Sequence, residues 1–375
     1  MKITTYEGRG RLGVTPSMPE SGHKLNRILI VFFLALSLHA PSLHAYSSAV
    51  VLQYHHVDVG TPSITSISPT DFAAHLQYLD DKNFSILPLN EINEALKNRK
   101  ELPDKVVAIT FDDAYLSIYT EAYPLLRLKN IPFTIFVATD LVGSSRRYLT
   151  WQQLAEMSEH GALVANHTQS HLHLLRLLDG ESHDEWRLRI RQEITGAQQE
   201  IEKRLGELPK LFAYPYGEYS LSILALVADL GYTGFGQQSG AMGADSNFLA
   251  LPRFPMDGIY ADLESFKTKS NTLVMPIHPI NIESVLEPGH FRPELKLNFT
   301  EGNWRTAELT CYGPGGKMNI DAINTTTFRV RPIADVPVGR TRYNCTMPSS
   351  QPERYFWYSQ PWIRKKDDGS WYPEP

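Results

Sequence analysis

Two short segments of the chain combine residue types that could bind a metal ion and move protons. The apolar run VVAITF leads directly into Asp112 and Asp113, and the run ALVA leads into a segment that contains His167 and His171. Two imidazoles and a carboxylate form a ligand set for zinc or a similar divalent ion, with positions left for water and substrate. Because neighbouring side chains of an extended segment diverge, we expect one aspartate to bind the metal and the other to act as a base.

Either segment alone has a plainer explanation. An Asp pair after a strand is commonly a solvated helix cap, and a pair of His residues is commonly ordinary surface. In a barrel of parallel strands, however, the carboxyl ends of the strands gather on one face, so segments far apart in the sequence can converge there.

Strands and helices that could position these residues are predicted from Ala49 to about Ile277. In this region, runs of β-branched residues alternate with amphipathic stretches. Helices are expected to start at Ser68-Pro69, Asn90 and Thr150, each a favourable N-cap before periodic apolar residues. The strand candidates are AVVLQY, FSIL, VVAITF, FTIFVA, ALVA, LFAY, TGFG and TLVMPI. The alternation predicts an α/β fold, a distorted (β/α) barrel of seven or eight strands, and leaves its closure open.

A different pattern begins after about Pro288. The runs LKLNFT, AELTCY, FRVRPI and RYNCTM alternate with period two, with turns such as GPGG between them. We expect residues 46–285 to form the barrel and residues 286–375 a small all-β, sandwich-like module. Its aromatic residues, among them Trp362 and Trp371, could stack on sugars or dock the module on the barrel, and docking is favoured.

The two cysteines, Cys311 and Cys345, both fall in predicted strands of this module. A small exported β-module has little core and commonly needs a covalent link, so we expect a disulfide between them. Two buried thiols are the alternative.

The N-terminal region predicts export. The apolar run ILIVFFLALSL follows Lys24 and Arg27 and precedes LHA, a small-residue cleavage site, and it is too short to span a membrane. Residues 1–45 are therefore predicted to be a signal peptide with an over-long leader, in which Met18 is a more ordinary start. The mature protein would be periplasmic or secreted, without a stable membrane span; an uncleaved anchor is the alternative.

Composition narrows the class of protein further. The 375 residues are 42% hydrophobic and 21% charged, with 36 Lys plus Arg against 41 Asp plus Glu. These values are typical of a folded protein, and a net charge of −5 provides no broad positive field. We therefore expect no nucleic-acid partner.

Three motifs resemble those of a known family. TFDD (110–113) and HTQSH (167–171) are similar to the first two motifs of the polysaccharide deacetylases, the NodB-homology group of carbohydrate esterase family four. FAYPYG (212–217) is similar to the third, and the resemblance covers about residues 50–260.

The resemblance implies a role for each matching residue. Asp112 would be the general base, and a divalent metal ion, with zinc favoured, would be the cofactor. The implied metal ligands are Asp113, His167 and His171, and the implied substrate contacts are Tyr216 and Pro215.

Two positions depart from the family pattern. Ala114 stands where the family usually has Gly, and Ala213 stands where it has an Arg that orients and tunes the base. Arg253, in the sequence LPRF, could replace that arginine and is also a candidate substrate-binding residue.

The catalytic acid has two candidates. The family usually places this His in a late L-x-x-H motif, where His278 stands between two prolines. LQYH ends the first predicted strand at His55, and YHHV resembles the start of the circularly permuted branch with the bacterial poly-N-acetylglucosamine deacetylases. Since the first and last strands of a closed barrel are neighbours, either His could reach the same mouth. His55 is favoured, with His56 as a packing or supporting residue.

The resemblance thus implies an exported, metal-dependent hydrolase that removes N-acetyl groups from amino sugars of a polysaccharide. One alternative is a catalytically silent carbohydrate-binding protein on the same fold, against which the intact ligand set argues. Another is a barrel glycosidase that uses Asp112 as its carboxylate, which leaves the His pair unexplained. Protein partners cannot be read from the sequence.

Overall fold

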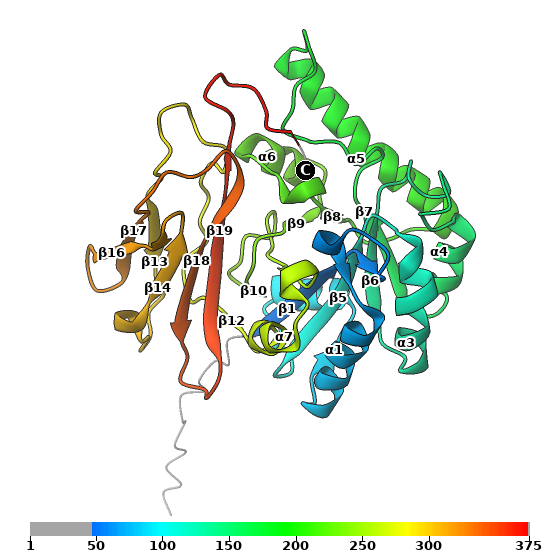
Figure 1. Ribbon diagram of the computed structural model, residues 1–375, viewed down its shortest axis with the longest axis horizontal. Helices are drawn as coiled ribbons and strands as arrows, with labels where there is room; N and C mark the ends of the chain where they lie inside the picture. Colours follow the sequence, from blue (N-terminus) through cyan, green and yellow to red (C-terminus); the bar gives the residue numbers. More distant parts are fainter. Residues whose placement is uncertain (1–46, 374–375) are drawn as a thin grey trace, which may run out of the picture. The chain divides into compact units, whose positions relative to one another are not determined.

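The fold is centred on a curved, mostly parallel sheet (Figure 1). The computed structural model describes residues 47–373, and the predicted signal peptide, residues 1–45, lies outside them. The strands of this sheet are β1 (Ser48–Tyr54), β4 (Ser85–Ile86), β5 (Val106–Asp112), β6 (Phe133–Val137), β7 (Ala162–Asn166), β8 (Leu211–Ala213), β9 (Thr233–Phe235), β10 (Ala241–Gly243) and β11 (Phe254–Pro255).

The strand order is that of a distorted (β/α) barrel, as predicted. The main path runs β10-β1-β5-β6-β7-β8-β9, with β4 beside β5 and β11 beside β1. All pairs are parallel except that of β1 with β10. A single bridge between Phe235, at the end of β9, and Leu251 links the last strand to the segment that leads into β11. Seven of the eight predicted runs supply strands to this sheet.

Helices connect the strands, and two begin at the predicted caps. The helices are α1 (Pro69–Asp81), α2 (Leu89–Lys97), α3 (Tyr123–Leu128), α4 (Trp151–Ser158), α5 (His183–Leu205), α6 (Leu221–Asp229) and α7 (Leu263–Ser270). The side chains of Ser68 and Thr150 accept from backbone N–H groups of the first turns of α1 and α4. The prediction of Asn90 as a cap is wrong, because α2 begins one residue earlier, after Pro88, and has no side-chain cap.

Successive residues of the central strands face two different cores. Val50 and Leu52 of β1 pack in a cluster that contains the apolar face of α1. Ala49 and Val51 pack in a second cluster that contains the apolar face of α2. A strand buried on both sides has this pattern, which explains why the strand sequences are almost continuously apolar.

The C-terminal region forms further β-sheets, as predicted. A five-stranded sheet has the order β12-β19-β18-β14-β15, and a three-stranded sheet has the order β13-β17-β16. Their strands are β12 (Leu273–Val274), β13 (Leu295–Asn298), β14 (Thr310–Gly313), β15 (Gly316–Lys317), β16 (Asn319–Ala322), β17 (Thr327–Arg331), β18 (Gly339–Pro348) and β19 (Tyr355–Arg364).

One strand lies in a different sheet from the one expected. The run TLVMPI was expected beside the barrel strands, but it supplies only β12, which pairs with Phe356 and Trp357 of β19. The barrel sheet instead has the short strands β10 and β11 along the edge of β1. These strands are two or three residues long, and such short runs give no readable periodicity.

The predicted disulfide is confirmed. Cys311 of β14 and Cys345 of β18 are directly opposite each other in the sheet, are fully buried, and are bonded through their sulfur atoms.

The aromatic residues of this region are mostly packed. Trp362 is 3% exposed, and Trp357 contacts Phe254 of the barrel in a T-shaped arrangement with the ring centres 5.3 Å apart. Among residues 47–373, no helix has the length and apolar character required to cross a bilayer.

Candidate active site

The candidate site lies at the carboxyl ends of the parallel strands, where a (β/α) barrel gathers functional residues. Asp112 is the last residue of β5, and Asp113 follows it. His167 comes directly after β7, and His55 comes directly after β1. The third motif follows β8, in the 3₁₀ turn η3 (Pro215–Gly217).

Three of the sequence-predicted residues form a compact ligand cluster. The donor atoms of Asp113, His167 and His171 all lie within 4.8 Å of one another. The Nε2 atoms of His167 and His171 are 3.4 and 3.2 Å from Oδ1 of Asp113. His167 is 1% exposed, and the side chain of His171 is 17% exposed, so His171 is the more accessible of the two imidazoles.

The hydrogen bonding of this cluster suits a metal ion. Nδ1 of His167 donates to the carbonyl of Ala213 at 2.7 Å, which fixes the ring and leaves Nε2 as the ligand atom. Oδ1 of Asp113 is buried without a hydrogen-bond donor, and a buried carboxylate oxygen calls for a cation. Burial alone would raise the pKa of Asp113, but the neighbouring His171 and His167 hold it well below its usual value.

The backbone around the cluster is strained. Asp113, Ala114, Thr168, His171 and Tyr216 all have positive φ, between 56° and 70°. Residues with a Cβ atom adopt this conformation at a cost, and such residues concentrate at functional sites. Ala114, which stands where the family usually has Gly, is thus an alanine that adopts the left-handed conformation.

Asp112 is separate from the ligand cluster and is held by a buried arginine. Nη1 and Nη2 of Arg253 donate to the two carboxylate oxygens at 2.7 and 2.8 Å, and both residues are 0% exposed. Nε2 of Gln53 donates to Oδ2 of Asp112 at 2.6 Å. Burial alone would raise the pKa of Asp112, but the Arg253 charge lowers it, so this carboxylate is ionised near neutral pH. The structure thus places Arg253 against Asp112 and not on an exposed wall.

His55 is paired with a carboxylate that sequence reasoning missed. Nδ1 of His55 lies 2.6 Å from Oδ2 of Asp257, which follows β11 and is 4% exposed. Burial lowers the pKa of His55, but the hydrogen bond and charge of Asp257 outweigh it and raise that pKa to about 9. Asp257 is followed by Gly258, and an Asp-Gly pair in the sequence indicates only a turn.

The two other candidate histidines lie elsewhere. The ring of His56 stacks on Tyr115 at 3.6 Å and is nearly buried. His278 is exposed, and its backbone N–H donates to the carbonyl of Asn298 in the C-terminal β region. Within residues 47–373, His278 forms no hydrogen bond or ion pair with Asp112 or Asp113, and it is not part of the Asp113, His167 and His171 cluster.

Tyr216 and Pro215 stand beside the ligand cluster. Tyr216 is half-buried, and its ring centre is 4.6 Å from that of His171 and 3.8 Å from that of His173. Pro215 is buried. Tyr216 is therefore the one side chain of the third motif that is not fully buried, and it could contact a ligand.

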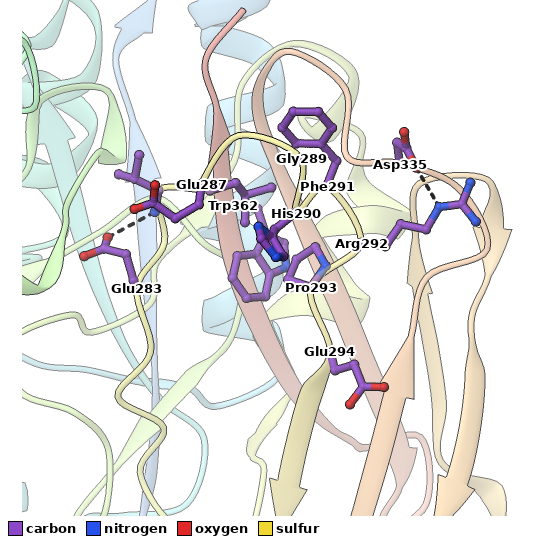
Figure 2. Close-up of a pocket in the computed structure, with 12 residues that line it drawn as sticks. Glu283, Glu287, Gly289, His290, Phe291, Arg292, Pro293, Glu294, Asp335 and Trp362 are labelled. Atoms are coloured by element: carbon purple, nitrogen blue, oxygen red, sulfur yellow. Dashed lines mark hydrogen bonds and ion pairs between the residues drawn. The ribbon is translucent and has the colours of Figure 1, made fainter. Parts of the chain in front are cut away.

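A hollow of about 770 Å³ lies in the C-terminal β region (Figure 2). Glu287, His290 and Trp362 are among its lining residues, and Arg292 forms an ion pair with Asp335 at its edge. None of the sequence-predicted site residues lines it. The hollow is therefore distinct from the cluster at the strand ends.

The fold and the cluster place the chain among (β/α)-barrel proteins with a candidate metal site and an adjoining buried carboxylate. Residues 99–235 match the sequence profile of the family described as Polysaccharide deacetylase. The chain therefore contains a polysaccharide deacetylase family domain, which confirms the predicted family. Circular permutation relative to other members stays a prediction.

Two relatives and one solved structure illustrate the similarity. YxkH of Bacillus subtilis, whose name assigns it to the polysaccharide deacetylases, is 28% identical over 204 residues, 54% of this chain and 69% of that protein. The poly-beta-1,6-N-acetyl-D-glucosamine N-deacetylase of Escherichia coli K12 is 24% identical over 253 residues, 58% of this chain but only 38% of that protein. The Streptococcus pyogenes deacetylase PplD, solved in complex with acetate, is 27% identical with a TM-score of 0.54, covering 60% of this chain and 99% of PplD.

Proposed function

We propose that the chain is a metal-dependent deacetylase that hydrolyses N-acetyl groups on amino sugars of a polysaccharide. The observation that supports this most directly is the Asp113, His167 and His171 cluster beside the separate, buried Asp112–Arg253 pair. Two imidazoles and a carboxylate favour zinc over a hard ion such as magnesium. A divalent ion bound there would polarise the acetyl carbonyl and lower the pKa of the attacking water.

Asp112 and His55 would each carry out one of the two proton transfers of the reaction. Asp112 stays ionised through its Arg253 partner and would accept the proton of the attacking water. His55, whose pKa Asp257 raises, would be protonated and would donate to the departing amine nitrogen. Tyr216 would form one wall against the sugar. Acetate leaves, and the polymer keeps a free amine that is positively charged at neutral pH.

The substrate we propose is a polymer of β-1,6-linked N-acetylglucosamine. The name of the Escherichia coli relative supports this polymer, and a chitin-like oligomer or peptidoglycan would be the alternatives.

We further propose that the protein is exported to the periplasm or secreted. The Cys311–Cys345 disulfide supports export, because such bonds persist mainly in oxidising compartments.

Removing the metal is expected to abolish activity. Acetate release from the three polymers should disappear after chelation and return with zinc, and His167→Ala should lose both the metal and the activity. Metal content would be measured on the same samples by atomic emission. Wild-type acetate release by metal-free protein would contradict the proposal. Polymer binding without any acetate release would favour the silent carbohydrate-binding protein.

Asp257→Asn is expected to move the alkaline limb of the pH–activity profile to lower pH. His55 must be protonated to act as the acid, so activity is lost as the pH rises through its pKa. Without the Asp257 charge, burial lowers that pKa with less opposition, and the loss begins at lower pH. The measurement is kcat/KM as a function of pH. An alkaline limb at the wild-type position would show that His55 is not the acid.

A further inference from the structure

A buried carboxylate beside the third motif connects the barrel to the C-terminal β region. Glu218 follows the turn η3, and its side chain is 0% exposed. It accepts hydrogen bonds from Nδ1 of His173 at 2.9 Å, from Nη1 of Arg340 at 3.0 Å and from the hydroxyl of Tyr372 at 2.5 Å. Arg340 belongs to β18, and Tyr372 lies in the tail after β19. Two of the three donors therefore come from the C-terminal region.

The same residues support the ring of Tyr216. His173 stacks on this ring nearly face to face, at 3.8 Å with an angle of 9° between the planes. The guanidinium of Arg340 lies 5.3 Å from the centre of the ring. Glu218 thus holds two residues that pack against Tyr216, one from the barrel and one from β18.

Tyr216 needs such support. Its φ of 60° lies in the left-handed region, which a residue with a Cβ atom occupies only when its surroundings impose it. The ring also lies 4.6 Å from His171 of the candidate metal site. A small change in the turn would therefore move the wall that faces the sugar, while the ligand atoms stay in place.

The tail itself is anchored at more than one point. Nη2 of Arg176 donates to the carbonyl of Tyr372 at 3.2 Å, and its guanidinium lies 5.6 Å from the ring of Trp371. The tail is thus packed on the loop that follows the second motif, so the hydroxyl of Tyr372 is held toward Glu218.

We propose that the C-terminal region, through Arg340 and Tyr372, positions the substrate wall of the active site by holding Glu218. Glu218 is a positioning residue, because it touches neither the ligand cluster nor Asp112 but acts through His173 and Tyr216. The inference rests on the proposed deacetylase function for its catalytic consequence. It assigns the C-terminal region a role in binding the polymer without direct contact with the reacting atoms.

Tyr372→Phe in the full chain tests this role, because it removes one hydroxyl far from the ligand cluster. We expect KM for the N-acetylglucosamine polymer to rise roughly tenfold, as for loss of a hydrogen bond to a charged group, with kcat little changed. Metal content and hydrolysis of a small aryl acetate, which does not need the sugar wall, should stay at wild-type values. Amide hydrogen exchange in residues 214–218 should become faster.

Tyr355→Phe is the matched control, since Tyr355 lies in the same β region with its side chain 43% exposed. It should change none of these quantities. Glu218→Gln, which weakens all three hydrogen bonds, should raise KM and exchange more than Tyr372→Phe does.

Two results would overturn the inference. One is wild-type KM and wild-type exchange in both Tyr372→Phe and Glu218→Gln. The other is an equal loss on the polymer and the aryl acetate, which would indicate general destabilisation. If the wild type released no acetate, the proposed function would fail, and the exchange of residues 214–218 would still decide whether the tail holds the turn.

Discussion

Asp112→Asn is expected to lower kcat by about 10²–10⁴ while the protein keeps its metal, because the change removes the base without removing a ligand. The structure separates the two aspartates clearly. Asp112 faces Arg253 and Gln53, whereas Asp113 faces His167 and His171. Metal content and kcat for acetate release would be measured on the same preparation.

Asp113→Asn is the variant with which Asp112→Asn should be compared. It should lose metal and activity together, since it weakens an oxygen ligand of the cluster. His55→Ala should resemble Asp112→Asn. Equal metal loss in all three variants would mean that the catalytic and ligand roles have been exchanged. Because Asp112→Asn also disturbs an ion pair, the activities should be compared well below the unfolding midpoint of each variant.

Arg253→Met is expected to lower the free energy of unfolding by about 3–5 kcal/mol, because it leaves the buried Asp112 charge without its partner. Gln53 would remain as a donor to Oδ2, and His167 and His55 would still lower the Asp112 pKa, but the largest charge that opposes the effect of burial would be gone. That pKa should rise, and the base should be lost at a higher pH than in the wild type. Urea unfolding gives the stability, and kcat/KM against pH gives the acid limb.

A second variant and a surface control test the same explanation. Arg253→Met combined with Asp112→Leu should recover much of the stability, since replacing both partners of a buried pair by apolar residues is often neutral. Arg187→Met breaks an ion pair with Asp229 whose side chains are 48% and 53% exposed, so it should cost at most about 1 kcal/mol. A comparable loss at Arg187 and Arg253 would show that burial of the pair is not the cause.

The sequence by itself determined the local elements and the residue types of the site. Continuous apolar runs predicted β5 and β7, because strands buried on both faces have few polar positions. Ser68 and Thr150 predicted helix starts, because their side chains satisfy the free N–H groups of a first turn. The shared edge of parallel strands allowed the segments of Asp112–Asp113 and His167–His171 to be expected at one face, and the family resemblance assigned Asp113 to the metal.

Only the tertiary structure decided which distant residues meet. Arg253 contacts Asp112 across 141 positions, and His55 contacts Asp257 across 202. The run TLVMPI joined the sheet of β19, and the tail at Tyr372 reached Glu218. Periodicity and caps report burial and local conformation, whereas these pairings depend on how whole strands and loops pack. A charged residue in a turn, such as Asp257, gives no local sign of its partner, so its role could be found only in the folded chain.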